Sequence, residues 1–149
     1  MLSREQYVAW SADESSLVRN VAELDLLLNK LDAEHGRDDP IILIVGGPGQ
    51  EDVYFGVGGD MSFVSSTEEP YLTTVGDNSA DGEVDYFFQG HHSPVARKQL
   101  IPADIARKII REFFVSGVLP SWQTWKPIGP DKAGLNRALP LLPHSFSAS

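Results

Sequence analysis

Cysteine is absent from the 149-residue sequence. Its absence excludes disulfide bonds, thiolate nucleophiles and zinc sites built on cysteine, and it fits a reducing compartment. The sequence also lacks any apolar run near the ~20 residues that a membrane-spanning helix needs. The amino-terminal segment, with Arg4 and Glu5, does not contain the apolar core of a secretory signal. These absences predict a cytoplasmic protein.

Lysine and arginine are both missing from residues 38–96, although this segment carries 11 carboxylates. Residues 1–37 carry a net charge of −3 and residues 97–149 carry +5, so the middle segment dominates the overall charge of −9. Such a field repels nucleic acid and anionic lipid and attracts basic proteins. The charge pattern therefore predicts a basic protein as the partner, and neither nucleic acid nor a membrane as a ligand.

Two segments have the apolar spacing that is typical of amphipathic helices. The first opens with a capping-box pattern at Asn20 and Glu23 and stops at Gly36, and its apolar stripe consists of Leu24, Leu27, Leu28 and Leu31. The second is predicted to start with Pro102 as its first residue and to end at Gly117, with an apolar stripe at Ile105, Ile109 and Phe113.

The remaining segments are short, β-prone and separated by glycine turns. Residues 41–45 are apolar throughout, which predicts a strand buried on both faces. Further strands are expected at 52–57, 61–66, 71–75, 84–88 and 122–125, and residues 6–10 suggest an edge strand. We therefore predict an α+β fold, in which two main helices pack on one face of an antiparallel meander sheet and leave the other face open. Residues 1–128 would form a single domain and residues 129–149 a loosely ordered tail.

Three patterns that could carry chemistry are incomplete. Gly46–Gly49 lacks the lysine and hydroxyl residue of a phosphate loop. Residues 77–82 match the first half of a calcium loop, but the twelfth position is Phe88 instead of glutamate. His91 and His92 are adjacent, so a strand would point them to opposite faces. We therefore predict no metal site and interpret residues 77–82 as an Asx-rich turn that displays carboxylates.

Five segments follow one another along the chain in a recognisable order. They are the helix from Val21, the glycine-rich stretch 56–62, residues 71–77, residues 87–91 and the segment Ile101–Trp125. Together they resemble the first-described immunity family of bacterial polymorphic toxin systems, whose members neutralise deaminase toxins. The resemblance implies a small α+β protein with no cofactor and no catalytic activity. It also implies one cognate toxin encoded nearby, expected to be a nucleic-acid (cytosine) deaminase.

A toxin that acts on nucleic acid needs a basic substrate groove, which an acidic protein face could occupy in place of phosphates. We therefore predict that acidic turns form the rim of a binding face and that Tyr71 or Phe87 anchors its centre. The partner-binding residues under this hypothesis are Asp60, Glu68, Glu69, Tyr71, Asp77, Asp81, Glu83, Asp85 and Phe87. The alternatives are immunity to a nuclease or ADP-ribosyltransferase toxin, a regulatory module with another basic partner, and a small enzyme using the clustered carboxylates or His91. The sequence leaves the oligomeric state open.

Overall fold

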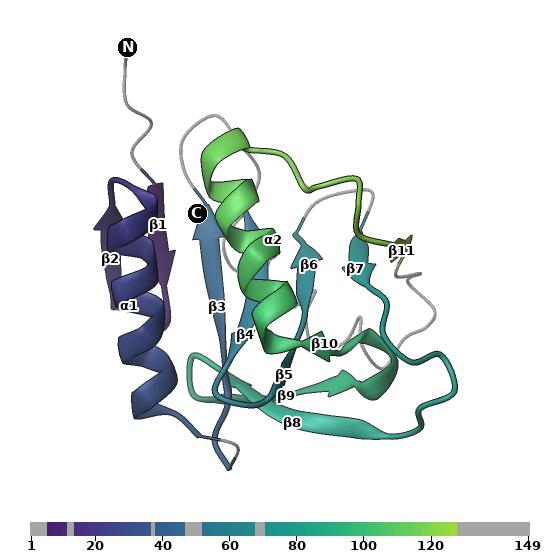
Figure 1. The fold of residues 1–149 in the computed structure, drawn as a ribbon. Coiled ribbons are helices and arrows are strands. Elements are labelled where there is room, and N and C mark those ends of the chain that lie inside the picture. The colour runs from purple at the N-terminus through teal and green to yellow at the C-terminus, as the bar shows by residue number, and fades with distance from the viewer. Residues whose placement is uncertain (1–5, 12–13, 37, 47–51, 68–70, 128–149) are drawn as a thin grey trace.

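The computed structural model describes residues 6–11, 14–36, 38–46, 52–67 and 71–127. These residues form two helices, α1 (Val21–Glu34) and α2 (Ala103–Ser116), and a short 3-10 helix, η1 (Arg97–Gln99) (Figure 1). The strands are β1 (Gln6–Ala9), β2 (Ser15–Val18), β3 (Ile41–Gly46), β4 (Val53–Val57), β5 (Met61–Ser62), β6 (Val64–Ser66), β7 (Leu72–Thr74), β8 (Glu83–Phe88), β9 (His91–Ala96), β10 (Ile101–Pro102) and β11 (Trp125–Pro127). The predicted α+β class is confirmed.

The main sheet has the strand order β2-β1-β3-β4-β6-β7-β11, and each neighbouring pair on this path is antiparallel. The apolar strand β3 lies inside the sheet and is buried along its whole length, as predicted. The prediction of an edge strand at residues 6–10 was wrong. Ser15–Val18 folds back on β1 and covers its outer side, so β2 is the edge. The polar composition of β2 concealed this pairing.

Both helices lie on one face of the sheet, antiparallel to each other (Figure 1). Their buried side chains pack against alternate residues of β3 and β4 in a cluster that includes Leu24, Leu28, Leu31, Ile109, Phe113, Leu43, Val45, Val53 and Phe55. The Arg111 guanidinium bridges them by donating to both carboxylate oxygens of Asp25, at 3.0 and 2.9 Å. The prediction of two helices on one face is confirmed.

The helix ends follow the predicted capping chemistry with one shift. The Asn20 Oδ1 accepts from the Glu23 N–H at 2.9 Å and caps α1. Gly117 ends α2 with φ 78°, which glycine adopts without steric cost. Pro102, predicted as the first helical residue, is instead the N-cap of α2 and the last residue of β10. It still starts the helix because its fixed φ suits either position.

The opposite face of the sheet is not open, which corrects the prediction. The β8–β9 hairpin crosses beneath it (Figure 1) and joins β3 through a parallel pairing of Ile41 with Phe87. Tyr86 and Phe88 point from β8 into a second core cluster with Ile42, Ile44, Tyr54, Phe63, Val95 and Leu100. Edge-to-face ring pairs join the hairpin to the sheet, at centroid distances of 5.3 Å for Phe63–Tyr86 and 5.8 Å for Tyr54–Phe88.

The last described strand is shorter than expected. β11 begins at Trp125 and pairs with β7, while Trp122 lies in a turn and its indole N–H donates to the Glu112 carboxylate at 2.9 Å. Residues 129–149, the predicted tail, lie outside the described residues. Among the helices that the structure describes, none combines the length and the apolar character that crossing a membrane requires.

Candidate partner-binding surface

Backbone hydrogen bonds gather four separate segments at one end of the molecule. The Gly58 N–H, in the β4–β5 turn, donates to Asp32 Oδ1 at the end of α1, at 3.1 Å. The Ala103 N–H at the start of α2 donates to the Asp60 carbonyl at 2.9 Å. The Phe87 N–H of β8 donates to the Pro40 carbonyl, also at 2.9 Å. These segments occupy the lower half of Figure 1.

All exposed acids of the described residues lie at this end, in the turns, helix termini and hairpin of the lower half of Figure 1. We call these side chains the acidic end: Glu14, Asp32, Glu34, Asp38, Asp39, Asp60, Asp77, Asp81, Glu83, Asp85 and Asp104. The other described acids are half-buried, and each bonds another side chain: Glu23 to Arg19, Asp25 to Arg111, Asp52 to Tyr7, and Glu112 to Trp122. The fold thus separates the half-buried acids from the exposed ones.

The β7–β8 loop holds its carboxylates in a fixed turn. Asp77 Oδ1 accepts from the Ser79 hydroxyl at 2.6 Å and from the Ser79 N–H at 2.9 Å, which confirms the predicted Asx turn. The hydroxyl bond first, and the amide bond second, lower the pKa of Asp77. The carboxylate therefore stays charged at neutral pH and points from a rigid loop.

The fold also brings cations to this loop that the linear charge pattern did not place there. The Arg97 N–H donates to the Gly82 carbonyl at 3.0 Å, and the Lys98 carbonyl accepts from the Gly76 N–H at 2.7 Å. Both residues are exposed beside Asp77, Asp81 and Glu83. These two cations therefore offset part of the negative charge near the β7–β8 loop. They offset less of the negative charge near the end of α1.

The two histidines of β9 do not form a metal site. His92 Nε2 lies 2.7 Å from Asp85 Oδ1, and the His92 ring leans on Phe87 with a centroid distance of 5.9 Å. Over the described ranges, no group of three histidine or acidic side chains gathers as a metal ion would require.

Comparison with known proteins identifies the family of this chain. The family model of the immunity protein Imm1 matches residues 12–127, which is most of the chain. The chain belongs to this family. The protein is therefore an immunity protein, and its partner is a cognate toxin. No curated protein matches the chain.

The predicted binding residues of this Imm1 protein fall into separate groups. Asp60, Asp77, Asp81, Glu83 and Asp85 are exposed at the acidic end, and the half-buried Phe87 lies beside them. Tyr71 is 41% exposed at the opposite end of the sheet, because it precedes β7 at the level where β3 ends. Phe87, in contrast, pairs with the first residue of β3, Ile41. Glu68 and Glu69 lie outside the described residues.

Sequence reasoning missed the acids at the end of α1 and at the start of α2. Asp32 and Glu34 occupy the last turn of α1, where no basic residue is present. A carboxylate in that position opposes the helix dipole, which favours cations at the C-terminal end. This local conflict was a signal, visible in the sequence, that these acids serve a purpose other than helix stability.

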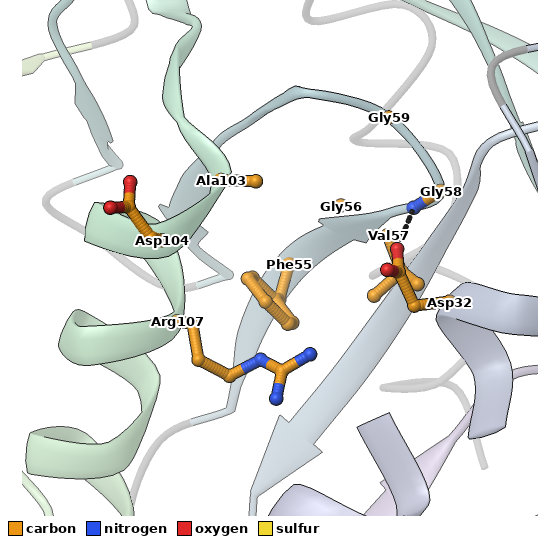
Figure 2. Close-up of a pocket in the computed structure, with 9 residues that line it drawn as sticks. All are labelled: Asp32, Phe55, Gly56, Val57, Gly58, Gly59, Ala103, Asp104 and Arg107. Carbon is orange, nitrogen blue, oxygen red and sulfur yellow. Dashed lines mark hydrogen bonds between the residues drawn. The ribbon is translucent and has the colours of Figure 1, made fainter. Parts of the chain in front are cut away.

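A hollow of about 270 Å³ lies between the end of α1, the β4–β5 turn and the start of α2, and Figure 2 shows the residues that line it. Arg107 extends from α2 beside Phe55 (Figure 2) and donates to Asn29 Oδ1 at 3.1 Å. Gly58 has φ +120°, and a Cβ there would lie 2.9 Å from the Pro40 Cα, so a larger residue would strain the turn. This requirement explains the glycine-rich stretch that contributed to the family resemblance.

Proposed function

We propose that this Imm1 protein neutralises a nucleic-acid deaminase toxin by placing its acidic end in the basic substrate groove of the toxin. The observation that supports this proposal most is the gathering of every exposed described acid at one end, from segments that are distant in sequence. Under this proposal the protein acts in the cytoplasm of the producing cell, by binding alone, without a cofactor or a reaction of its own.

The electrostatics favour a groove as the target. A nucleic-acid groove is lined with cations that hold phosphates, and fixed carboxylates can replace those phosphates. Complementary charge also speeds encounter, from about 10⁵–10⁶ M⁻¹s⁻¹ for neutral surfaces toward 10⁸ M⁻¹s⁻¹ or more at low salt. A protein that must protect its own cell from an active toxin gains from fast association.

Neutralising the acids tests this proposal. The test variant combines Asp60→Asn, Asp77→Asn, Asp81→Asn, Glu83→Gln and Asp85→Asn, and asparagine keeps the oxygen acceptor of the Asp77 turn. Stopped-flow association with an inactive toxin from the neighbouring gene should slow by about tenfold, with a shallower salt dependence.

A charge-matched control separates local recognition from net charge. Ala22→Lys, Leu26→Lys, Val115→Lys, Val118→Lys and Ser121→Lys also raise the net charge by five, at exposed positions away from the acidic end. The control should retain most of the association rate. Equal slowing in both variants would show that net charge, and not the acidic end, drives encounter.

The deaminase assignment needs a separate test, because a nuclease groove is also basic. Co-expression of the chain with the neighbouring toxin should rescue growth, and base-conversion mutations should accumulate in unprotected cells. Strand breaks without base conversion would assign the toxin to the nucleases and leave the immunity role intact.

A further inference from the structure

An aromatic groove of about 620 Å³ lies beside the acidic end, between the β1–β2 turn, the C-terminal half of α1 and the β8–β9 turn. Trp10, Ile41 and Phe87 supply its apolar surface, and Glu14, Glu34 and Asp39 supply carboxylates. Lys30 adds one positive charge to this lining. The groove therefore combines exposed ring surface with an excess of negative charge.

The sheet register orients both rings toward α1. Val8 pairs with Val45 on the helical face of the sheet, and Trp10 follows two residues later on that face. Phe87 pairs with Ile41, which belongs to the same core cluster, although Phe87 arrives from the hairpin. The chain thus brings two aromatic residues from distant segments to the same edge of β3.

Both rings are held before any partner arrives. Trp10 and Phe87 pack against the helical core cluster beneath them while part of each remains exposed. Backbone bonds fix their positions, from the Trp10 N–H to the Glu14 carbonyl at 3.0 Å and from the Phe87 N–H to the Pro40 carbonyl at 2.9 Å. Little conformational entropy is lost when such rings bind a ligand.

The carboxylates of the groove are exposed to solvent. Asp39 Oδ1 accepts from the Gly36 N–H at 2.9 Å, and Asp39 Oδ2 lies 3.4 Å from His35 Nδ1. The amide bond first, and His35 to a smaller degree, lower the pKa of Asp39. Glu14 and Glu34 are exposed and line the same groove.

We propose that this groove receives one arginine side chain from the basic surface of the toxin. A guanidinium stacks on aromatic faces and donates to carboxylates in the same plane, which a lysine ammonium does not do. The inference rests on the proposed function, because it names the anchor within the acidic end. Aromatic pockets and the arginines that fill them carry much of the binding energy of interfaces.

Leucine substitutions at the rings test the groove while keeping apolar contact with the core. Trp10→Leu and Phe87→Leu should each raise the dissociation constant of the inactive toxin by about three- to thirtyfold, the range that cation–π contacts supply. The matched control is Trp122→Leu, because Trp122 is 47% exposed but lies in the turn that follows α2, where its indole N–H donates to Glu112 of that helix. The control should bind as the wild type does.

A second variant avoids the packed rings altogether. Glu14→Gln combined with Glu34→Gln changes only exposed side chains. It should weaken binding to a similar extent with an unchanged melting temperature, so a loss of affinity cannot come from misfolding of the core.

A probe of the groove alone separates its failure from failure of the proposed function. In NMR titrations, N-acetyl-arginine amide should shift the Trp10 indole N–H and the Gly90 amide, and N-acetyl-norleucine amide should not. If the wild type binds the toxin but the ring variants bind equally well and the arginine probe causes no shift, the groove inference is wrong and the immunity role stands. If the wild type does not bind the toxin, the proposed function fails whatever the probe shows.

Discussion

At the scale of single residues, one half-buried contact shows how burial and charge act together in this protein. The Tyr7 hydroxyl donates to Asp52 Oδ2 at 2.9 Å and joins β1 to the start of β4. Burial, and then the bond to Asp52 and its charge, raise the pKa of Tyr7 to about 12. The folded protein therefore holds the Tyr7 proton more tightly than the unfolded chain, whose tyrosines titrate near 10.

This shift predicts an alkaline loss of stability. A group whose pKa is higher in the folded state contributes stability below its unfolded pKa, and loses it as pH rises toward the folded pKa. The stability difference between wild type and Tyr7→Phe should therefore be constant up to about pH 9 and shrink between pH 10 and 12. Urea unfolding at a series of pH values measures it. A difference that stays constant to pH 12 would contradict the assigned contact.

At the scale of elements, the sequence predicted those whose signals are local. Periodicity located α1 and α2 to within one or two residues, and the apolar run located β3. It missed β2, whose serines resemble a loop, because that strand forms only through pairing with β1. It also missed β9, a strand that contains Pro94, a residue disfavoured in strands. Pro94 is tolerated because β9 pairs with β8 alone among the described strands. The other side of β9 therefore needs no backbone hydrogen bonds to a neighbouring strand.

The candidate site was predictable only in part for the same reason. The acids of residues 60–85 were visible as a charge run, but which of them meet depends on the register of β3, β7 and β8. The register separates Tyr71 from Phe87, and it brings Trp10 to Phe87 across 77 positions of sequence. Contacts at such distances leave no local pattern in the chain.

The β8–β9 hairpin, which carries Phe87, contains an unfavourable turn residue. Gln89 and Gly90 have φ of 51° and 83°, the positive values that type I′ turns require at both positions. Asparagine tolerates this region better than glutamine. Gln89→Asn should therefore stabilise the protein by up to about 1 kcal/mol, and Gln89→Val should destabilise it by about 1–2 kcal/mol. Urea unfolding measures both, and a less stable asparagine variant would argue against this turn geometry.

At the scale of the whole molecule, the exposed acids gather at one end of the helix axes, although Arg97 and Lys98 lie beside some of them. The acidic end lies at the start of α2 and the end of α1, whereas the exposed Lys108 and Arg111 lie further along α2. A molecule with charge at one end is oriented by the field of a cationic partner before contact. Under the proposed function, the acidic end therefore contacts the basic groove of the toxin first. The aromatic groove of the immunity protein, which lies beside the acidic end, then contacts the toxin.

This orientation leads to a prediction about the substrate. If the acidic end occupies the groove that holds phosphates, immunity protein and nucleic acid cannot bind the toxin together. Fluorescence anisotropy of a labelled oligonucleotide on inactive toxin should fall as immunity protein is added, with an apparent inhibition constant that rises linearly with oligonucleotide concentration.

The variant with five neutralised acids should need about tenfold more protein for the same displacement, because fewer carboxylates replace the phosphates, whereas Trp122→Leu should act as the wild type does. A stable ternary complex would instead mean that the acidic end binds a surface outside the groove, and that inhibition acts through the conformation of the toxin.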